Sequence, residues 1–296
     1  MRIAVLRGGP SDAYETSLES GQHALENLRA DHNPTDIFID RDGLWYKGGL
    51  SIQPIRLLNQ ADVFVNALHG SYGEDGQAVR VLDMIGARYT GSQPTALSLT
   101  FNKNLAKNIL TRAGLVVPMG VVVDTLRDPY DVTDELHRNM GGQYVVKPLF
   151  GTMSQGIEIV RAQRDLAETL VRSLLNYKKV LVEERLQGPE VKVVFIEGFR
   201  GKRDYTLLPI DNLSLTQPRM LSREDRNLAS EIAITAHKAL GLRHYSSTDI
   251  IFTRRGPIVL EVDPLPPLGP EYHLSNSLKA VGSSLREFLK HIVSRA

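Results

Sequence analysis

The chain has 296 residues, of which 42% are hydrophobic and 23% are charged, and its formal net charge is +1. This length suits two or three packed domains, and the near-neutral charge gives no reason to expect nucleic acid or a membrane as a partner. The sequence has no cysteine, which excludes disulfides, a thiolate nucleophile and Cys-ligated zinc. No apolar run reaches the roughly 18 residues of a transmembrane helix, so we expect a cytoplasmic protein.

Strand and helix patterns alternate along the N-terminal third of the chain. Apolar runs predict strands, and a helical period predicts a helix, at residues 3–6, 17–30, 36–39 and 62–68. This alternation favours a parallel sheet wrapped by helices, in which ligands bind at the carboxyl ends of the strands. The loops most relevant to function are therefore residues 8–15 and 69–76.

Three polar residues in or beside these loops are candidates for substrate binding. Glu15 and Ser17 lie where the first loop leads into a helix, and His69 begins the second loop. A carboxylate and a histidine in this place could hold the amino group and the carboxylate of a small substrate. Ser17 could equally be a helix N-cap, and His69 could equally be a hydrogen-bonded structural histidine.

Two lysines in the next part of the chain are candidate phosphate ligands. Lys147 ends the predicted strand 144–148 and precedes the loop 151–156, whose glycines and small residues, Ser154 among them, allow backbone N–H groups to approach phosphate. Lys103 lies in the first turn of a helix predicted over 102–113, where the helix dipole slightly disfavours a cation. A plain turn and an exposed surface lysine are the alternatives.

The helix predicted over 102–113 should bury Leu105, Ile109 and Leu110 and end at Gly114. We also predict a strand at 157–160 and a helix near 165–175.

The predicted strand 179–183 runs directly into a group of acidic residues. Glu183 ends the strand, Glu184 and Leu186 follow it, and Glu190 comes after a Gly-Pro pair. Such a strand end offers backbone groups to an adenine edge and a carboxylate to ribose hydroxyls. A strand and turn with surface acids would show the same pattern.

The C-terminal part has strand patterns at residues 190–197, 205–210, 248–252 and 258–262. A helix is predicted between the second and third of these strands, with Ser222 as N-cap and Asp225 three residues later. Its apolar stripe consists of Leu228, Ile232, Ala236 and Leu240.

Three carboxylates in the last two strands are candidate metal ligands. Glu261 and Asp263 are alternate residues of one strand, so they point to the same side, and Asp249 lies in the preceding strand. The short turn 253–256 lets the two strands pair as a hairpin, which would bring the three carboxylates together. Hard oxygen ligands suit Mg²⁺, which shares itself with phosphates. A solvated acidic hairpin is the alternative, although the flanking apolar runs favour burial.

Taken in order, these motifs resemble the ATP-grasp superfamily and, within it, the D-alanine–D-alanine ligase family. The resemblance covers nearly the whole chain and rests on residues 4–9 (AVLRGG), 15–18 (ETSL), 68–76 (LHGSYGEDG), 89–92 (YTGS), 102–103 (NK), 146–148 (VKP), 182–183 (VE), 188–190 (GPE) and 260–263 (LEVD). It implies an α/β (α+β) ATP-grasp fold of three packed units. These are an N-terminal parallel-sheet domain at 1–92, a small central unit at 93–186 and a C-terminal unit with an antiparallel, metal-binding sheet at 187–296.

The resemblance also implies a reaction. ATP phosphorylates the carboxylate of one D-alanine, the amine of a second attacks the acylphosphate, and a dipeptide for peptidoglycan synthesis results. For the nucleotide, the resemblance implies phosphate contacts for Lys103 and Lys147, adenine contacts for Glu183 and the backbone near Leu186, and ribose binding for Glu190. It implies that Asp249, Glu261 and Asp263 bind two Mg²⁺, with Mn²⁺ as an alternative. It also implies that Glu15 binds the ammonium of the first amino acid, with Ser17 and His69 nearby. We further expect a homodimer.

The sequence departs from the family pattern in the half that should bind the second substrate. Asp263 stands where the family usually has Asn, Ser247 stands where it has an arginine facing the oxyanion, and Met153 stands where it has a serine. The lid loop expected after Pro209 is short, and residues 264–273 replace the segment that grips the second D-alanine. A ligase for another carboxylate and amine, or a non-catalytic nucleotide-binding homologue, are therefore the rival interpretations.

Overall fold

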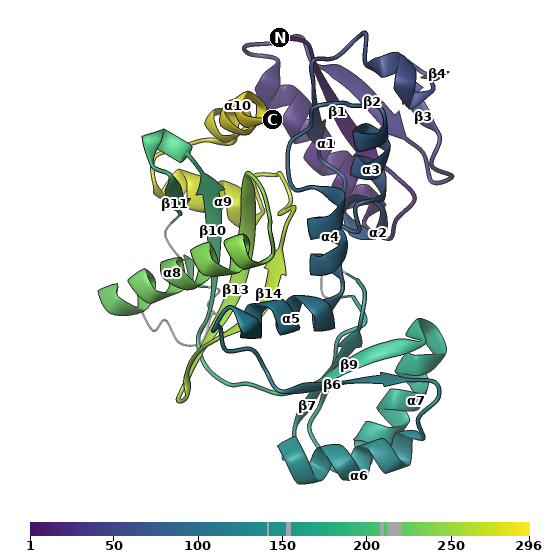
Figure 1. The fold of residues 1–296 in the computed structure, drawn as a ribbon, viewed down its shortest axis with the longest axis vertical. Helices are drawn as coiled ribbons and strands as arrows, with labels where there is room; N and C mark the ends of the chain where they lie inside the picture. Colours follow the sequence, from purple (N-terminus) through teal and green to yellow (C-terminus); the bar gives the residue numbers. More distant parts are fainter. Residues whose placement is uncertain (141, 152–154, 208–209, 212–220) are drawn as a thin grey trace.

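The computed structural model describes residues 1–140, 142–151, 155–207, 210–211 and 221–296, and it forms three sheets stacked along one axis (Figure 1). Ser154, Met153 and Pro209, named above, lie outside the described residues. None of the helices in the described part is long and apolar enough to cross a membrane.

The N-terminal unit lies at one end of the molecule. In chain order its elements, with the two helices that follow them, are β1 (Ile3–Gly8), α1 (Tyr14–Leu28), β2 (Thr35–Ile39), β3 (Trp45–Lys47), β4 (Leu50–Ser51), the 3₁₀ helix η1 (Pro54–Leu57), β5 (Val63–Asn66), α2 (Gly70–Gly73), α3 (Gln77–Met84), α4 (Pro94–Phe101) and α5 (Lys103–Arg112). The sheet order is β4-β3-β2-β1-β5. β1 is parallel to β2 and β5, as predicted, whereas β3 and β4 add antiparallel strands at one edge.

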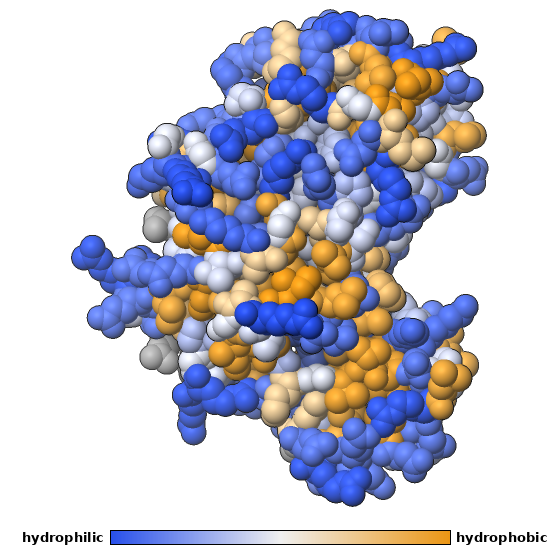
Figure 2. Space-filling view, viewed as in Figure 1, coloured by the Kyte–Doolittle hydropathy of each residue, from blue (hydrophilic) through white to orange (hydrophobic). Residues whose placement is uncertain are grey.

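The central unit lies at the opposite end and has an antiparallel sheet of order β6-β9-β7-β8, with two helices packed against each other beside it (Figure 1). Its elements are β6 (Gly120–Asp124), α6 (Pro129–Met140), β7 (Tyr144–Pro148), β8 (Glu158–Val160), the 3₁₀ helix η2 (Gln163–Asp165), α7 (Leu166–Tyr177) and β9 (Lys179–Glu184). Apolar side chains gather over the region of α5 and this sheet on one face (Figure 2).

The C-terminal unit lies between the other two. Its elements are β10 (Glu190–Glu197), the 3₁₀ helix η3 (Phe199–Gly201), β11 (Asp204–Thr206), β12 (Ile210–Asp211), α8 (Arg223–Ala239), β13 (Tyr245–Thr253), β14 (Gly256–Asp263), α9 (His273–Ala280) and α10 (Leu285–Arg295). The sheet is antiparallel, of order β11-β10-β13-β14, and β12 also pairs with β10. The single strand predicted at 205–210 is thus two short strands, β11 and β12.

The buried cores cross the sequence boundaries. One core joins the N-terminal sheet with α9 and α10 from the end of the chain. A second joins α4 and α5 with α8 and the C-terminal sheet, and a third belongs to the central unit alone. The expected division at residues 92 and 186 stays a prediction, and the packing shows that α5 is built into the C-terminal unit's core.

Helix α5 is rotated relative to the apolar stripe predicted for it, whereas the stripe predicted for α8 is confirmed except at Leu228. In α5 the buried residues are Lys103, Ala106, Lys107 and Leu110, and Leu105 is 43% exposed. In α8 the capping box of Ser222 and Asp225 is present as predicted. Of the predicted stripe, Ile232, Ala236 and Leu240 are buried, and Leu228 alone is exposed, at 40%. The burial of two lysines on α5 is informative, because lysine is rarely buried without a partner.

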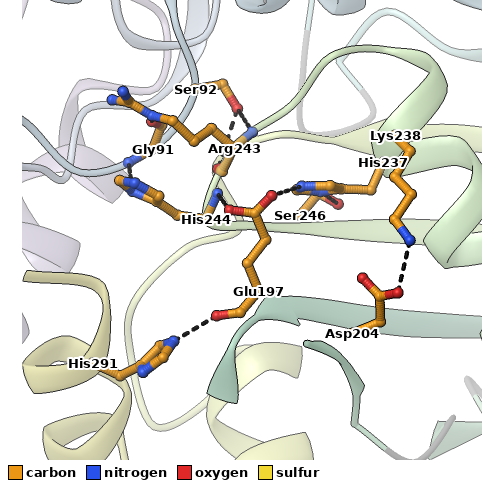
Figure 3. A network of polar contacts seen from close by, with 10 residues as sticks. All are labelled: Gly91, Ser92, Glu197, Asp204, His237, Lys238, Arg243, His244, Ser246 and His291. Atoms are coloured by element: carbon orange, nitrogen blue, oxygen red, sulfur yellow. Dashed lines mark hydrogen bonds and ion pairs between the residues drawn. The ribbon is translucent and has the colours of Figure 1, made fainter. Parts of the chain in front are cut away.

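A polar network joins the N-terminal and C-terminal units (Figure 3). The Gly91 amide donates to His244 Nδ1 at 3.0 Å, and the Arg243 guanidinium donates to the Gly91 carbonyl at 3.1 Å. The Glu197 carboxylate accepts from the His244 amide at 2.9 Å and lies 3.4 Å from His237. Burial lowers the pKa of His244 to about 4, so its ring stays neutral and can accept from Gly91. The network fixes the start of β13.

Candidate active site

The β13–β14 hairpin brings the three predicted carboxylates to one side of the sheet. Asp249 pairs with Glu261, and Ser247 pairs with Asp263, across the two antiparallel strands. The register shifts directly after Asp249, so that Ile250 faces Val259, which leaves one extra residue on β14. Such a β-bulge re-aims the side chains beside it and is common next to active sites. The predicted hairpin and the common side of its carboxylates are confirmed.

These carboxylates line a cavity of about 230 Å³ where the three units meet. The lining residues are Glu74, Thr100, Phe101, Lys103, Gly151, Lys192, Ser247, Asp249, Glu261, Val262, Asp263, Pro264, Pro266, Pro267, Tyr272, His273 and Leu274. A smaller adjoining pocket shares Lys103, Gly151 and Glu261 with it and adds Lys147. The two hollows together form one polar site between the central and C-terminal units.

Two of the three carboxylates are paired with a lysine. Lys103 Nζ lies 3.3 Å from Glu261, and it also donates to the Gly151 carbonyl. Lys192 Nζ lies 2.9 Å from Asp249. The sequence pointed to Lys103, but Lys192 was missed. Its signal is a lysine within the otherwise apolar run Val191–Ile196, because a cation in such a strand needs a partner.

Burial and the lysines set the charge of these carboxylates. Burial raises the pKa of Asp249 to about 7, although Lys192 opposes the shift, and burial raises the pKa of Asp263 to about 6. Burial also acts to raise the pKa of Glu261, but Lys103 and then Lys147 outweigh it and the pKa is lowered. Glu261 is therefore ionised, and a cation near Asp249 and Asp263 would favour their ionised forms as well.

The carboxylates fit Mg²⁺ by the chemistry of their oxygens. Asp249 Oδ1 is a buried oxygen with no hydrogen-bond partner among the described residues. Within that part of the chain, however, no three acidic or histidine side chains are grouped closely enough to hold a metal by themselves. Mg²⁺ commonly takes one or two carboxylates and completes its shell with water and phosphate oxygens, and this donor set suits such binding.

A second charged cluster lies behind the smaller pocket. The Glu183 carboxylate contacts Lys107 Nζ at 2.6 Å and Lys147 Nζ at 2.8 Å, and all three side chains are at most 10% exposed. Burial lowers the pKa of Lys107 to about 8, against the opposing charge of Glu183. Glu183 thus anchors Lys147 beside the pocket, and Lys107, which the sequence did not single out, completes the cluster.

The remaining residues predicted to bind nucleotide lie near the junction of the central and C-terminal units. The Glu184 carboxylate accepts from the Met119 amide at 3.0 Å and from Arg255 at 2.7 Å. Leu186 lies in the connection between β9 and β10, and Glu190 is the first residue of β10. Their predicted contacts with adenine and ribose stay predictions.

None of the three residues predicted in the N-terminal unit, Glu15, Ser17 and His69, lines the cavity or the smaller pocket. Glu15 is ion-paired with Arg41 at 3.0 Å, with 75% of its side chain exposed, and it does not line the cavity. Ser17 is buried, donates to the Ala13 carbonyl and accepts from the His69 amide. His69 is buried against Ser20 at 2.8 Å, and burial lowers its pKa to about 4.

Glu74, which was not predicted, is the residue of this unit that lines the cavity. Its carboxyl accepts from the Gly70 amide at 2.9 Å, and burial, with the charge of Asp263, raises its pKa well above the usual value. A neutral carboxylic acid at this wall can donate a hydrogen bond to a ligand.

The divergent segment 264–273 forms one wall of the cavity. Pro264, Pro266 and Pro267 line it together with Tyr272 and His273. Burial and the Lys192 ammonium lower the pKa of His273 to about 4, so its ring is neutral. Ser247 stands where the family has an arginine, and His273 is neutral. The Lys192 ammonium is therefore the positive charge that lines this side of the cavity.

Comparisons with known proteins identify relatives along the whole chain. A family model described as the D-ala D-ala ligase C-terminus matches residues 109–294. The D-alanine–D-alanine ligase of Desulforudis audaxviator is 30% identical, with 100% of this chain and 98% of the relative covered. The chain belongs to the D-alanine–D-alanine ligase family. The ligase of Halalkalibacterium halodurans, 28% identical over 99% of this chain and 98% of its own length, is a further relative.

Solved structures of this family confirm the fold. The VanG D-Ala:D-Ser ligase from Enterococcus faecalis superimposes with a TM-score of 0.84 at 23% identity, covering 99% of this chain and 98% of that one. The Bacillus anthracis D-alanine–D-alanine ligase complexed with ATP gives a TM-score of 0.81 at 24% identity, with coverage of 100% and 96%. These structures confirm the α/β ATP-grasp fold, and the family model together with the 30% identical relative confirms the family resemblance inferred from the sequence.

Proposed function

We propose that this chain is an ATP-dependent ligase that joins the carboxylate of one D-alanine to the amine of a second, supplying a dipeptide for peptidoglycan synthesis. The observation that carries the proposal is the single cavity in which Lys103, Lys192 and three carboxylates meet between the units of an ATP-grasp fold. Membership of the D-alanine–D-alanine ligase family supports the choice of substrate.

The proposed phosphate site is built from two units. Lys103, at the start of α5, and Lys147, at the end of β7, both line the smaller pocket and approach it from different elements. Together they would hold the phosphates of ATP. Mg²⁺, when bound with ATP on Glu261 and Asp263, would neutralise charge on the transferred phosphoryl group.

The proposed chemistry divides the cavity between two substrates. The carboxylate of the first amino acid takes the γ-phosphoryl group from ATP, the amine of the second attacks the acylphosphate, and phosphate leaves. Glu15, which is exposed and paired with Arg41 outside the cavity lining, is proposed to exchange Arg41 for the ammonium of the first amino acid, with Ser17 and His69 nearby. The wall at 264–274 would keep water from the acylphosphate, because hydrolysis there would turn the ligase into an ATPase.

A second candidate is a ligase of the same mechanism with a different acceptor. The observation in its favour is the wall built from Pro264, Pro266 and Pro267, with Ser247 opposite Asp263, where the family pattern differs. Such a wall offers mainly apolar surface and few hydrogen bonds to the second amino acid. The acceptor could therefore be another amino acid or amine.

The test is a screen for ATP-dependent phosphate release with Mg²⁺ and pairs of D- and L-amino acids or hydroxy acids, with the mass of each product measured. We expect D-alanine to support product formation and L-alanine not to, and a Glu261→Gln variant to serve as the inactive control. A product containing only one D-alanine would support the second candidate. Nucleotide binding without any product would favour a non-catalytic homologue.

Homodimerisation, a cytoplasmic location and the use of Mn²⁺ in place of Mg²⁺ are part of the same proposal. Analytical ultracentrifugation at micromolar concentration would test the first, cell fractionation the second, and phosphate release with each metal the third.

A further inference from the structure

Lys192 is a cation placed where a metal ion would otherwise be expected. It lies on β10 directly across from Asp249 on β13, because the two residues are paired in the antiparallel ladder. Its Nζ lies 2.9 Å from Asp249 Oδ2, and it lines the cavity with only 25% of its side chain exposed. The backbone ladder thus fixes this ammonium beside this carboxylate.

Unlike Asp249 and Glu261, Asp263 is not ion-paired with a lysine of the described residues. Lys103 contacts Glu261 at 3.3 Å and reaches it from α5 rather than from a neighbouring strand. Asp263 accepts from the Leu265 amide at 2.8 Å and has no ion pair with any lysine or arginine of the described residues. By contrast, Oδ2 of Asp249 is already held by a fixed cation, and only its Oδ1 lacks a hydrogen-bond partner among the described residues.

From this geometry we infer that Lys192 takes the place of one of two divalent ions, so that the enzyme binds Mg·ATP with a single Mg²⁺ held by Glu261 and Asp263. The inference rests on the proposed function. A metal ion bound to Asp249 would be separated from the Lys192 ammonium only by the carboxylate group that both contact. Two positive charges at such a short distance repel each other. Two carboxylates on alternate residues of one strand, completed by phosphate oxygens and water, are sufficient for one Mg²⁺.

The experiment counts metal ions directly. Mn²⁺ is titrated into the protein with a non-hydrolysable ATP analogue at a concentration below that of the protein, and free Mn²⁺ is measured by electron paramagnetic resonance. We expect the wild type to saturate at one Mn²⁺ per bound analogue. The Lys192→Met variant should bind a second Mn²⁺, because Asp249 is then released.

Two further variants make the count decisive. Lys192→Met combined with Asp249→Asn should return to one Mn²⁺, because the second site then lacks its carboxylate. The matched control is Lys238→Met, which removes the ammonium from an exposed ion pair with Asp204 of similar length, 2.7 Å, and it should keep the wild-type count.

Two tight Mn²⁺ ions on the wild type with the analogue bound would overturn this inference and leave the proposed function intact. Failure of the wild type to bind the analogue would overturn both. The wild-type count decides the question even where the Lys192→Met variant does not fold.

Discussion

Replacing Glu183 by glutamine should destabilise the protein more than any single change on its surface. Glu183 is 3% exposed, and its two oxygens each contact a lysine, Lys107 at 2.6 Å and Lys147 at 2.8 Å. A glutamine of the same shape offers one weaker acceptor and turns an N–H group towards the other ammonium. Two buried cations then share a site that has lost its negative charge.

The expected magnitude follows from these distances. At an effective dielectric constant of about 20, Coulomb's law gives roughly 6 kcal/mol for each contact at this separation. Part of this attraction only offsets the desolvation of the three groups, so the net loss is smaller. Removing one partner of a buried ion pair typically costs about 3–5 kcal/mol, and we expect Glu183→Gln to fall in that range.

The assay is urea unfolding monitored by circular dichroism and by hydrogen exchange of the central unit. Glu135→Gln is the matched control, because Glu135 makes an exposed ion pair with Arg127 in the same unit and should cost at most about 1 kcal/mol. Adding Lys107→Met to Glu183→Gln should recover stability, since it removes one uncompensated cation. A Glu183→Gln variant within about 1 kcal/mol of the wild type, or a double variant less stable than the single one, would refute this reasoning.

Three other predictions follow from the site and its surroundings. Glu261→Gln should lower ATP-dependent phosphate release on the order of 10²-fold or more, because it removes a metal-binding charge; unchanged turnover would exclude Glu261 from this role. Glu15→Gln should raise the KM for the amino acid in the same assay and leave that for ATP nearly unchanged; a rise in both would show that Glu15, paired with Arg41, is structural. The pKa of His244 is lowered from 6.5 to about 4, so its contribution to stability is fully present above pH 6.5 and is lost as the pH falls towards 4, by about 3 kcal/mol in total. Urea unfolding of wild type and His244→Gln across this range should show a smaller acid loss in the variant, and parallel curves would contradict the assignment.

The carboxylate hairpin could be predicted from the sequence because all of its determinants are local. Glu261 and Asp263 are alternate residues of one apolar run, and the short turn before Gly256 allows only the neighbouring strand with Asp249 to pair with it. Side-chain alternation then fixes which side the carboxylates occupy. The helix cap at Ser222 was predictable for the same reason, since its partner Asp225 is three residues away.

The lysines of the site could not all be found in this way, because their partners are distant in sequence. Lys192 and Asp249 come together only because β10 pairs with β13, and no pattern in either strand specifies that register. The rotation of α5 was missed because Leu105 has the higher hydrophobicity, whereas tertiary packing buries the face carrying Lys103 and Lys107. The ion pairs of these lysines with Glu261 and Glu183 outweigh the free energy that burying Leu105 would contribute.

This buried face of α5 carries two lysines that pair with two different sheets. Lys103 and Lys107 are four residues apart, so they lie on the same face one turn from each other. Lys103 contacts Glu261 of the C-terminal sheet, and Lys107 contacts Glu183 of the central sheet. A ligand that draws Lys103 towards a phosphate must weaken its contact with Glu261, while Lys107 still holds the central unit to the helix. If Lys103 binds phosphate as proposed, α5 would therefore couple that binding to both units through these charge pairs, in addition to the apolar packing of α5 against the C-terminal sheet.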